Sequence, residues 1–169
     1  VDWCKKNITT RFPNFNFHYI PLVNDLYSSS GKKAANFKFP YNDNCFDLAV
    51  ANSVFTHMVP NEVENYMSEI SRILKPGGIC YATFFLYDDD MKFSPTFDFS
   101  TDMGHYRLMN QRVKSANVAY SNEYLWRELI EKNVFQLIHQ FEGFWKGHSR
   151  ENCTDFQDIV ILKKLDSIH

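Results

Sequence analysis

Glycine is scarce in this chain and is missing from its N-terminal part. Only 6 of the 169 residues are glycine, and the first of them is Gly31. No two glycines stand in a G-x-G arrangement, so the chain lacks the G-x-G-x-x-G turn that brings a dinucleotide close to a helix N-terminus. This absence argues against a nicotinamide-dependent dehydrogenase.

Other absences exclude further classes of protein. The sequence has no apolar run of about 18 residues, so no membrane partner is expected. Residues 1–10 are polar and charged and do not resemble the apolar region of a signal peptide. The formal net charge is -2 with both signs mixed, which argues against a nucleic-acid partner. The four cysteines form no CxxC pair, so no metal site is expected. We therefore expect a cytoplasmic protein.

The chain is 44% hydrophobic, which suits a single domain over residues 1–169 with one sizeable core. Alternating strand and helix patterns run through its first half. Residues 46–55 and 79–86 are nearly continuous apolar runs, typical of parallel strands buried on both faces. Residues 60–74 between them place apolar side chains on one stripe and predict a helix. Residues 1–10 predict the end of a helix, and residues 15–23 predict a further strand.

The second half contains a long irregular region and then a regular end. Residues 87–120 are polar and aromatic, and we expect them to form a lid-like insertion over a binding site. A helix capped by Ser121 is predicted to run to about Asn133, with Trp126 among its buried residues and with Asn133 in the left-handed turn at its end. Residues 135–144 and 158–165 predict an antiparallel hairpin. The order of elements indicates a layered α/β domain with a mostly parallel sheet and an antiparallel C-terminal edge.

Three segments then carry a family resemblance. Residues 39–47, FPYNDNCFD, resemble the "FPF-D-x-SFD" entry into strand four of the class I S-adenosylmethionine-dependent methyltransferases, of the methyltransferase type 11-like group. Residues 53–58, SVFTHM, resemble the segment that leaves that strand. Residues 69–78, EISRILKPGG, resemble the helix end and turn before strand five. The resemblance implies a three-layer α/β/α Rossmann-like fold, S-adenosylmethionine as cofactor, and methyl transfer to a small molecule.

The chain departs from the family at its start. The family's glycine-rich turn after strand one, and the acidic residue that ends strand two, are not in this sequence. We therefore expect a partial domain without its first strands, about 50 residues short by the size of a βαβ unit. A truncated reading frame and a naturally shortened relative are both open explanations. An exposed sheet edge should result, with strand 15–23 pairing either with strand 46–55 or across a homodimer.

Ligands of such folds lie beyond the carboxyl ends of the parallel strands. The resemblance places Ser53 and Val54 at the methionine part of the cofactor, and Leu22 and Asp43 near its adenine. Each assignment has a structural alternative. Ser53 and Val54 can belong to an ordinary strand end followed by a helix cap, Asp43 to an Asx turn, and Leu22 to plain core packing. The full set of expected cofactor-binding residues is Leu22, Asp43, Asn52, Ser53, Val54 and Phe55.

His57 is the candidate general base, because the pKa of an imidazole lies near neutrality. A structural histidine is the alternative, since methyl transfer often needs little more than a well-placed nucleophile. Arg107, among aromatic neighbours, suits an anionic substrate group; a surface loop is the alternative. The expected substrate-binding residues are His105, Tyr106, Arg107 and Trp145.

Two functions follow from these observations. The first is an enzyme domain that transfers a methyl group from S-adenosylmethionine to a small molecule. The second is a non-catalytic, methyltransferase-like remnant that acts as a binding or dimerisation module. The matched segments favour the enzyme function for the family. The missing glycine turn favours the non-catalytic remnant for this chain, which would then be inactive.

Overall fold

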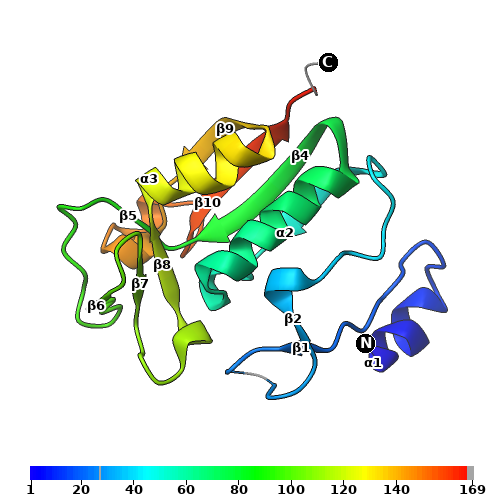
Figure 1. Ribbon diagram of the computed structural model, residues 1–169, viewed down its shortest axis with the longest axis horizontal. Coiled ribbons are helices and arrows are strands. Elements are labelled where there is room, and N and C mark those ends of the chain that lie inside the picture. Colours follow the sequence, from blue (N-terminus) through cyan, green and yellow to red (C-terminus); the bar gives the residue numbers. More distant parts are fainter. Residues whose placement is uncertain (27, 167–169) are drawn as a thin grey trace.

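The computed structural model describes residues 1–26 and 28–166, and its centre is a four-stranded sheet (Figure 1). The strands, in spatial order, are β3 (Phe46–Ala51), β4 (Leu74–Phe84), β10 (Asp158–Lys164) and β9 (Phe135–Phe141). The Rossmann-like α/β class and the antiparallel C-terminal edge are confirmed. The expectation of a mostly parallel sheet is not met in this central sheet, where the β3–β4 pair is parallel and the β4–β10 and β10–β9 pairs are antiparallel. The reason is that β10 lies between β4 and β9 and runs against both.

The predicted helix between the two central strands is present as α2 (Pro60–Ile73). Pro60 stands at the first position, where a missing N–H costs no hydrogen bond. The Glu62 carboxylate accepts a hydrogen bond from the Val59 N–H at 3.0 Å, which satisfies one of the free amides at the helix start. The stripe that packs on the sheet consists of Val63, Met67, Ile70 and Ile73, all buried.

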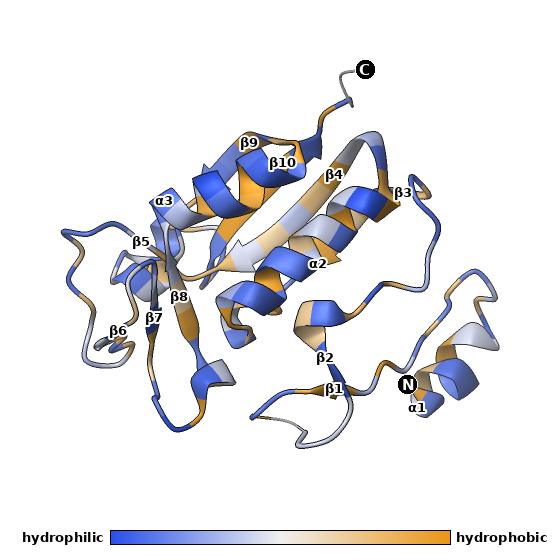
Figure 2. Cartoon of the chain, in the orientation of Figure 1, coloured by the Kyte–Doolittle hydropathy of each residue, from blue (hydrophilic) through white to orange (hydrophobic). Residues whose placement is uncertain are grey.

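A second helical segment covers the same face of the sheet (Figure 1). It begins with α3 (Asn122–Tyr124) and continues through residues 125–133. The Ser121 hydroxyl accepts a hydrogen bond from the Tyr124 N–H at 3.1 Å, so the predicted cap is confirmed. In Figure 2 both helices carry hydrophobic and hydrophilic stripes, as expected of helices with one packed face. No helix in the described ranges is long and apolar enough to cross a membrane.

Two details of this helix differ from the prediction. Trp126 is 46% exposed, because its neighbours Leu125 and Leu129 define the buried face and Trp126 lies beside it. The left-handed residue is Val134, with φ at 58°, and not Asn133. The Asn133 side chain instead donates a hydrogen bond to the Leu129 carbonyl at 3.0 Å, so the chain reverses one residue later.

The N-terminal residues do not join the central sheet. The helix formed by α1 (Asp2–Cys4) and residues 5–9 buries none of its side chains. Of the expected strand 15–23, β1 (Leu22–Val23) forms, and it pairs in parallel with β2 (Lys32–Lys33). The expectation that this strand moves against strand 46–55 is therefore wrong. Pairing across a homodimer remains a prediction.

β3 consequently forms an edge of the sheet, and it is not buried on both faces as its apolar sequence predicts. Its side chains Leu48 and Val50 are 56% and 61% exposed. They point away from α2, towards the face on which Phe141 of β9 is also exposed. In the part of the chain that the structure describes, helices cover one face of this sheet, and the expected third layer is not seen.

Residues 87–120 are more regular than their sequence indicates. They contribute to a second small sheet with the strand order β5 (Leu86–Tyr87), β8 (Val118–Ser121), β7 (Tyr106–Leu108) and β6 (Thr101–Asp102). Aromatic side chains from this region and from the β9–β10 connection form a separate core. Its buried members are Phe85, Tyr87, Phe99, Ala119 and Trp145.

Candidate functional site

A pocket of about 270 Å³ opens at the carboxyl end of β3. It collects four of the residues expected from the sequence, Leu22, Ser53, Val54 and His57, although Leu22 is far from the others in the chain. This is the place where open α/β sheets bind their ligands. The remaining lining residues are Val23, Asn24, Ala34, Met58, Glu62 and Tyr66.

The backbone at the end of β3 is held in an uncommon conformation. Ser53 has φ at 54°, a left-handed value that side chains other than glycine rarely adopt. Its N–H donates to the Thr83 hydroxyl at 2.8 Å, and its own hydroxyl donates to Gln157 Oε1 at 3.1 Å. The Thr83 hydroxyl donates to the same Gln157 oxygen at 2.6 Å. Three strand ends thus fix the turn that forms the pocket floor.

We expect Thr83→Val to lower the free energy of unfolding by about 1–3 kcal/mol, because the Ser53 N–H and the Gln157 amide lose a buried partner. Urea unfolding measures this change. Thr56→Val is the matched control, since Thr56 is equally buried but its hydroxyl has no hydrogen-bond partner among the described residues. That control should be neutral or stabilising. Equal costs for the two variants would contradict the role given to Thr83.

His57 lies at the end of the 3₁₀ turn Phe55–His57 and is half-buried in the pocket wall. Its Nδ1 is 3.1 Å from the carbonyl oxygen of Ser115. The Asn24 side chain donates a hydrogen bond to the His57 carbonyl at 3.0 Å. Both the ring and the main chain of His57 are therefore held by other segments.

The first turns of α2 give the pocket its acidic and phenolic groups. Burial raises the pKa of Glu62, against the lowering effect of the Val59 hydrogen bond. Burial, and then the nearby Glu62 carboxylate, raise the pKa of Tyr66 to about 12. The Tyr66 phenol therefore stays protonated at neutral pH and can donate a hydrogen bond to a ligand.

A second pocket of about 280 Å³ adjoins the first, sharing Val54 and Tyr66 in its lining. Its other lining residues are mostly apolar and come from residues 20–41, β3 and α2. A flat apolar ring suits such a wall. These lining residues are Ile20, Phe39, Tyr41, Ala49, Val50, Ala51, Ile70 and Ile73.

Three expected cofactor residues do not line the first pocket. Asn52 is exposed beside the Ser53 turn. Phe55 is fully buried and stacks on Phe84 with ring centroids 5.0 Å apart, so it lies in the core beneath the pocket. Asp43 is bound at 2.7 Å by Arg72 of α2, which also holds Glu69 at 2.7 Å.

The Arg72 network gives a pH prediction. Hydrogen bonding to Arg72 is the main cause that lowers the pKa of Glu69 below its ordinary value of 4.5, against partial burial. Stability from this group is present above pH 4.5 and is lost as pH falls through the lowered folded-state pKa. At pH 7 the free energy of unfolding of wild type should exceed that of Glu69→Gln by about 1 kcal/mol. The difference should shrink below pH 4.5 in urea unfolding at several pH values, and a constant difference would contradict the assignment.

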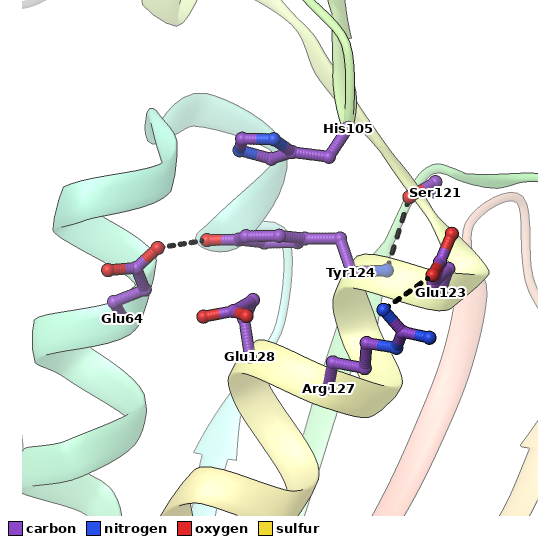
Figure 3. A pocket seen from close by; sticks show the side chains of 7 residues that line it. All are labelled: Glu64, His105, Ser121, Glu123, Tyr124, Arg127 and Glu128. Carbon is purple, nitrogen blue, oxygen red and sulfur yellow. Dashed lines mark hydrogen bonds and ion pairs between the residues drawn. The ribbon is translucent and has the colours of Figure 1, made fainter.

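The expected substrate residues lie away from the His57 pocket. His105 lines another pocket of about 330 Å³, between the start of α2 and α3 (Figure 3). Its ring stacks on Tyr124 at 4.7 Å, and the Tyr124 hydroxyl donates to Glu64 at 2.8 Å. Glu123 pairs with Arg127 at 3.0 Å in the same view. Tyr106 is half-buried and packs against the main core.

Trp145 is a member of the separate aromatic core around Phe85, and Arg107 lies against the same core. The Arg107 guanidinium pairs with Asp102 at 2.6 Å and lies over the rings of Tyr87 and Phe93. Trp145 is 3% exposed, and its indole N–H donates to Asp158 at 2.8 Å. The structure therefore does not bring these two residues to the pocket that contains His57.

Several pocket residues were not expected from the sequence. In the sequence, Glu62 and Tyr66 look like ordinary residues of the predicted helix 60–74. The position of Glu62 in the first turn, near the expected ligand site, could have identified it. Thr83 is a lone hydroxyl near the carboxyl end of an apolar strand, which was a weaker signal. Gln157 gave none, since its partner Ser53 is 104 residues away. No group of three or more potential metal ligands was found within residues 1–26 and 28–166.

The comparisons with known proteins agree with this geometry. A sequence profile described as "Methyltransferase domain" matches residues 15–82. A solved structure of an S-adenosylmethionine-dependent methyltransferase from Methanosarcina mazei is 20% identical with a TM-score of 0.55, covering 82% of this chain and 67% of that one. Such identities establish a shared fold.

Two further structures have the same fold. One is 1,6-didemethyltoxoflavin-N1-methyltransferase from Burkholderia thailandensis with bound 1,6-didemethyltoxoflavin and S-adenosylhomocysteine (16% identity, TM-score 0.50, covering 82% of this chain and 50% of that chain). The other is human N-acetylserotonin methyltransferase in complex with S-adenosylmethionine (15% identity, TM-score 0.51, covering 81% of this chain and 33% of that chain). This chain thus spans half and one third of their lengths. Residues 15–82 thus match a methyltransferase-domain pattern, and the chain shares the fold of these methyltransferases.

Proposed function

We propose that the pocket at the carboxyl end of β3 binds S-adenosylmethionine and supports methyl transfer to a small molecule. The observation that carries the proposal is the meeting of Leu22, Ser53, Val54 and His57 in one pocket. Leu22 comes from a separate segment of the chain; the family resemblance assigns Ser53 and Val54 to the cofactor, and the chemistry of an imidazole makes His57 the candidate base. The net charge of -2, with both signs mixed along the chain, favours a small acceptor over a nucleic acid.

The residues present fit one part of such a cofactor. The Tyr66 phenol and the main chain around Ser53 offer hydrogen bonds to an amino-acid group, and the adjoining apolar wall suits a ring such as adenine. The Glu62 carboxylate complements a positive charge. The glycine-rich turn that the family uses is not among the residues of this chain.

The cofactor, when bound, supplies a methyl group on a sulfonium sulfur. The chain's contribution is to hold the acceptor in line with that group, to exclude water and to accept a proton. His57 is the lining residue suited to accept the acceptor's proton at neutral pH. The fixed Ser53 turn supplies rigidity, because Thr83 of β4 and Gln157, the residue before β10, hold it by hydrogen bonds.

Calorimetric titration with S-adenosylhomocysteine tests the proposal. We expect wild type to bind at micromolar concentrations, and Leu22→Arg to abolish binding because a charged side chain would fill the pocket. Leu26→Arg is the matched control, since Leu26 lies in the turn that follows β1 but is 41% exposed and is not part of the pocket lining. Absence of binding to wild type at millimolar ligand would overturn the proposal.

The second candidate is a non-catalytic dimerisation module, and the exposed edge of β3 favours it. An antiparallel pairing of two β3 strands would set Leu48 against Val50 of the other copy with no like charges opposed. Sedimentation of wild type and Val50→Lys tests this alternative. It predicts a dimer that the lysine disrupts, whereas a monomeric wild type would remove it.

A further inference from the structure

We propose that Asp25 is a positioning residue for His57: it holds the 3₁₀ turn Lys114–Ala116 so that the Ser115 carbonyl fixes the imidazole as its Nδ1–H tautomer. The inference deepens the proposed function and rests on the role of His57 given there. Asp25 does not line the pocket, so its effect would pass through Ser115.

The first step is the grip of Asp25 on the turn. One carboxylate oxygen accepts the Lys114 N–H at 2.8 Å, and the other accepts the Ser115 N–H at 3.0 Å. Two bonds from one carboxylate to consecutive amides fix the orientation of the backbone at Ser115, and charge-assisted bonds are stronger than neutral ones. Asp25 lies near the end of β1 and Ser115 lies just before β8, so this grip joins the N-terminal segment to the insertion.

The second step is the contact between Ser115 and His57. The Ser115 carbonyl oxygen is 3.1 Å from His57 Nδ1. A carbonyl can only accept a hydrogen bond, so Nδ1 must carry a hydrogen. In the neutral ring Nε2 then bears the lone pair, which is the atom that can take a proton. In other protein sites too, a hydrogen-bond acceptor at one imidazole nitrogen fixes the tautomer and so leaves the lone pair on the other nitrogen.

The turn that contains Asp25 also holds the main chain of His57. The neighbouring Asn24 donates to the His57 carbonyl at 3.0 Å, and its own oxygen accepts the Leu26 N–H at 3.0 Å. Asn24 therefore fixes the main chain from which the His57 side chain extends, and Asp25 fixes the carbonyl acceptor that Nδ1 faces. One short segment sets both ends of the side chain.

The charge state of Asp25 suits this task. Partial burial raises the pKa of Asp25. Hydrogen bonds from the Ser115 side chain and from the Ser115 and Lys114 amides lower it by a larger total amount, so the net shift of the pKa is downward. The carboxylate is therefore charged at neutral pH. Asp25 is an exposed residue, so we expect the Asp25→Ala chain to fold.

The test is a long-range ¹H–¹⁵N spectrum of the histidine rings in the uniformly labelled chain, above the pH at which they titrate. His57→Gln assigns the His57 signals. We expect the Nδ1–H pattern in wild type and a loss of that pattern towards the Nε2–H form in Asp25→Ala. Asp25→Asn keeps one acceptor oxygen and should give an intermediate shift.

Asp47→Ala is the matched control, because Asp47 is also exposed and its ion pair with Lys75 at 2.8 Å lies at the opposite end of β3. It removes the same charge and should leave the His57 pattern unchanged. An unchanged His57 pattern in a folded Asp25→Ala protein would overturn the inference, as would an Nε2–H pattern in wild type.

Calorimetry separates this inference from the proposed function. Asp25→Ala should bind S-adenosylhomocysteine within about twofold of wild type, because Asp25 is outside the pocket. If wild type fails to bind, the proposed function is wrong, and the tautomer spectra still decide whether Asp25 positions His57. If wild type binds and the tautomer does not depend on Asp25, the positioning role alone is wrong.

Discussion

Asp158→Ala is expected to lower the free energy of unfolding by about 3–5 kcal/mol, because it leaves several buried N–H donors without their acceptor and removes one of the two carboxylates that face a buried lysine. Asp158 is fully buried at the start of β10. Its two oxygens accept the Leu86 N–H at 2.7 Å, and the Gly143 N–H and the Trp145 indole N–H at 2.8 Å. The Lys146 ammonium, itself 8% exposed, lies 3.2 Å away.

Urea or thermal unfolding measures this loss, and Glu142→Ala is its matched control. Glu142 pairs with the same Lys146 at 3.1 Å but its side chain is 59% exposed. An exposed ion pair contributes little, so the control should cost less than about 1 kcal/mol. Near-equal costs for the two variants would show that the buried network around Asp158 is not what holds the β9–β10 connection.

Phe55→Ala is the second large effect, again with an expected cost of about 3–5 kcal/mol. Its place beyond the carboxyl end of a predicted strand put Phe55 among the expected cofactor residues, but the ring is fully buried and stacks on Phe84. Phe84 in turn meets Tyr120 edge to face, with ring centroids 6.2 Å apart. Removing the Phe55 ring leaves a cavity beneath the pocket, which explains why stability should fall.

Chemical unfolding and calorimetry together decide this second prediction. Phe55→Leu keeps most of the volume and should cost about 1–2 kcal/mol. Phe12→Ala removes an equal ring that is 55% exposed and should change stability by no more than about 0.5 kcal/mol. A stable Phe55→Ala protein that has lost S-adenosylhomocysteine binding would show instead that Phe55 contacts the cofactor.

The predictions that succeeded depended on local periodicity. The stripe on residues 60–74 became α2, and the apolar runs on either side became β3 and β4. The edge position of β3 could not be predicted from its own residues, because an apolar run does not say whether a neighbouring strand is present. The strand at residues 15–23 failed for the same reason: aromatic residues favour a strand, yet a strand forms only where backbone partners exist.

The succession β3, α2, β4 and the antiparallel end of the sheet were determined by the sequence alone, because each of these elements carries its own pattern of apolar and polar positions. Only the tertiary structure decided which polar groups meet. Ser53 and Gln157 are 104 residues apart, Asp25 and Ser115 are 90 apart, and His57 and Ser115 are 58 apart. No local pattern encodes such pairs, since they depend on how whole segments pack together, and the candidate site is built from them.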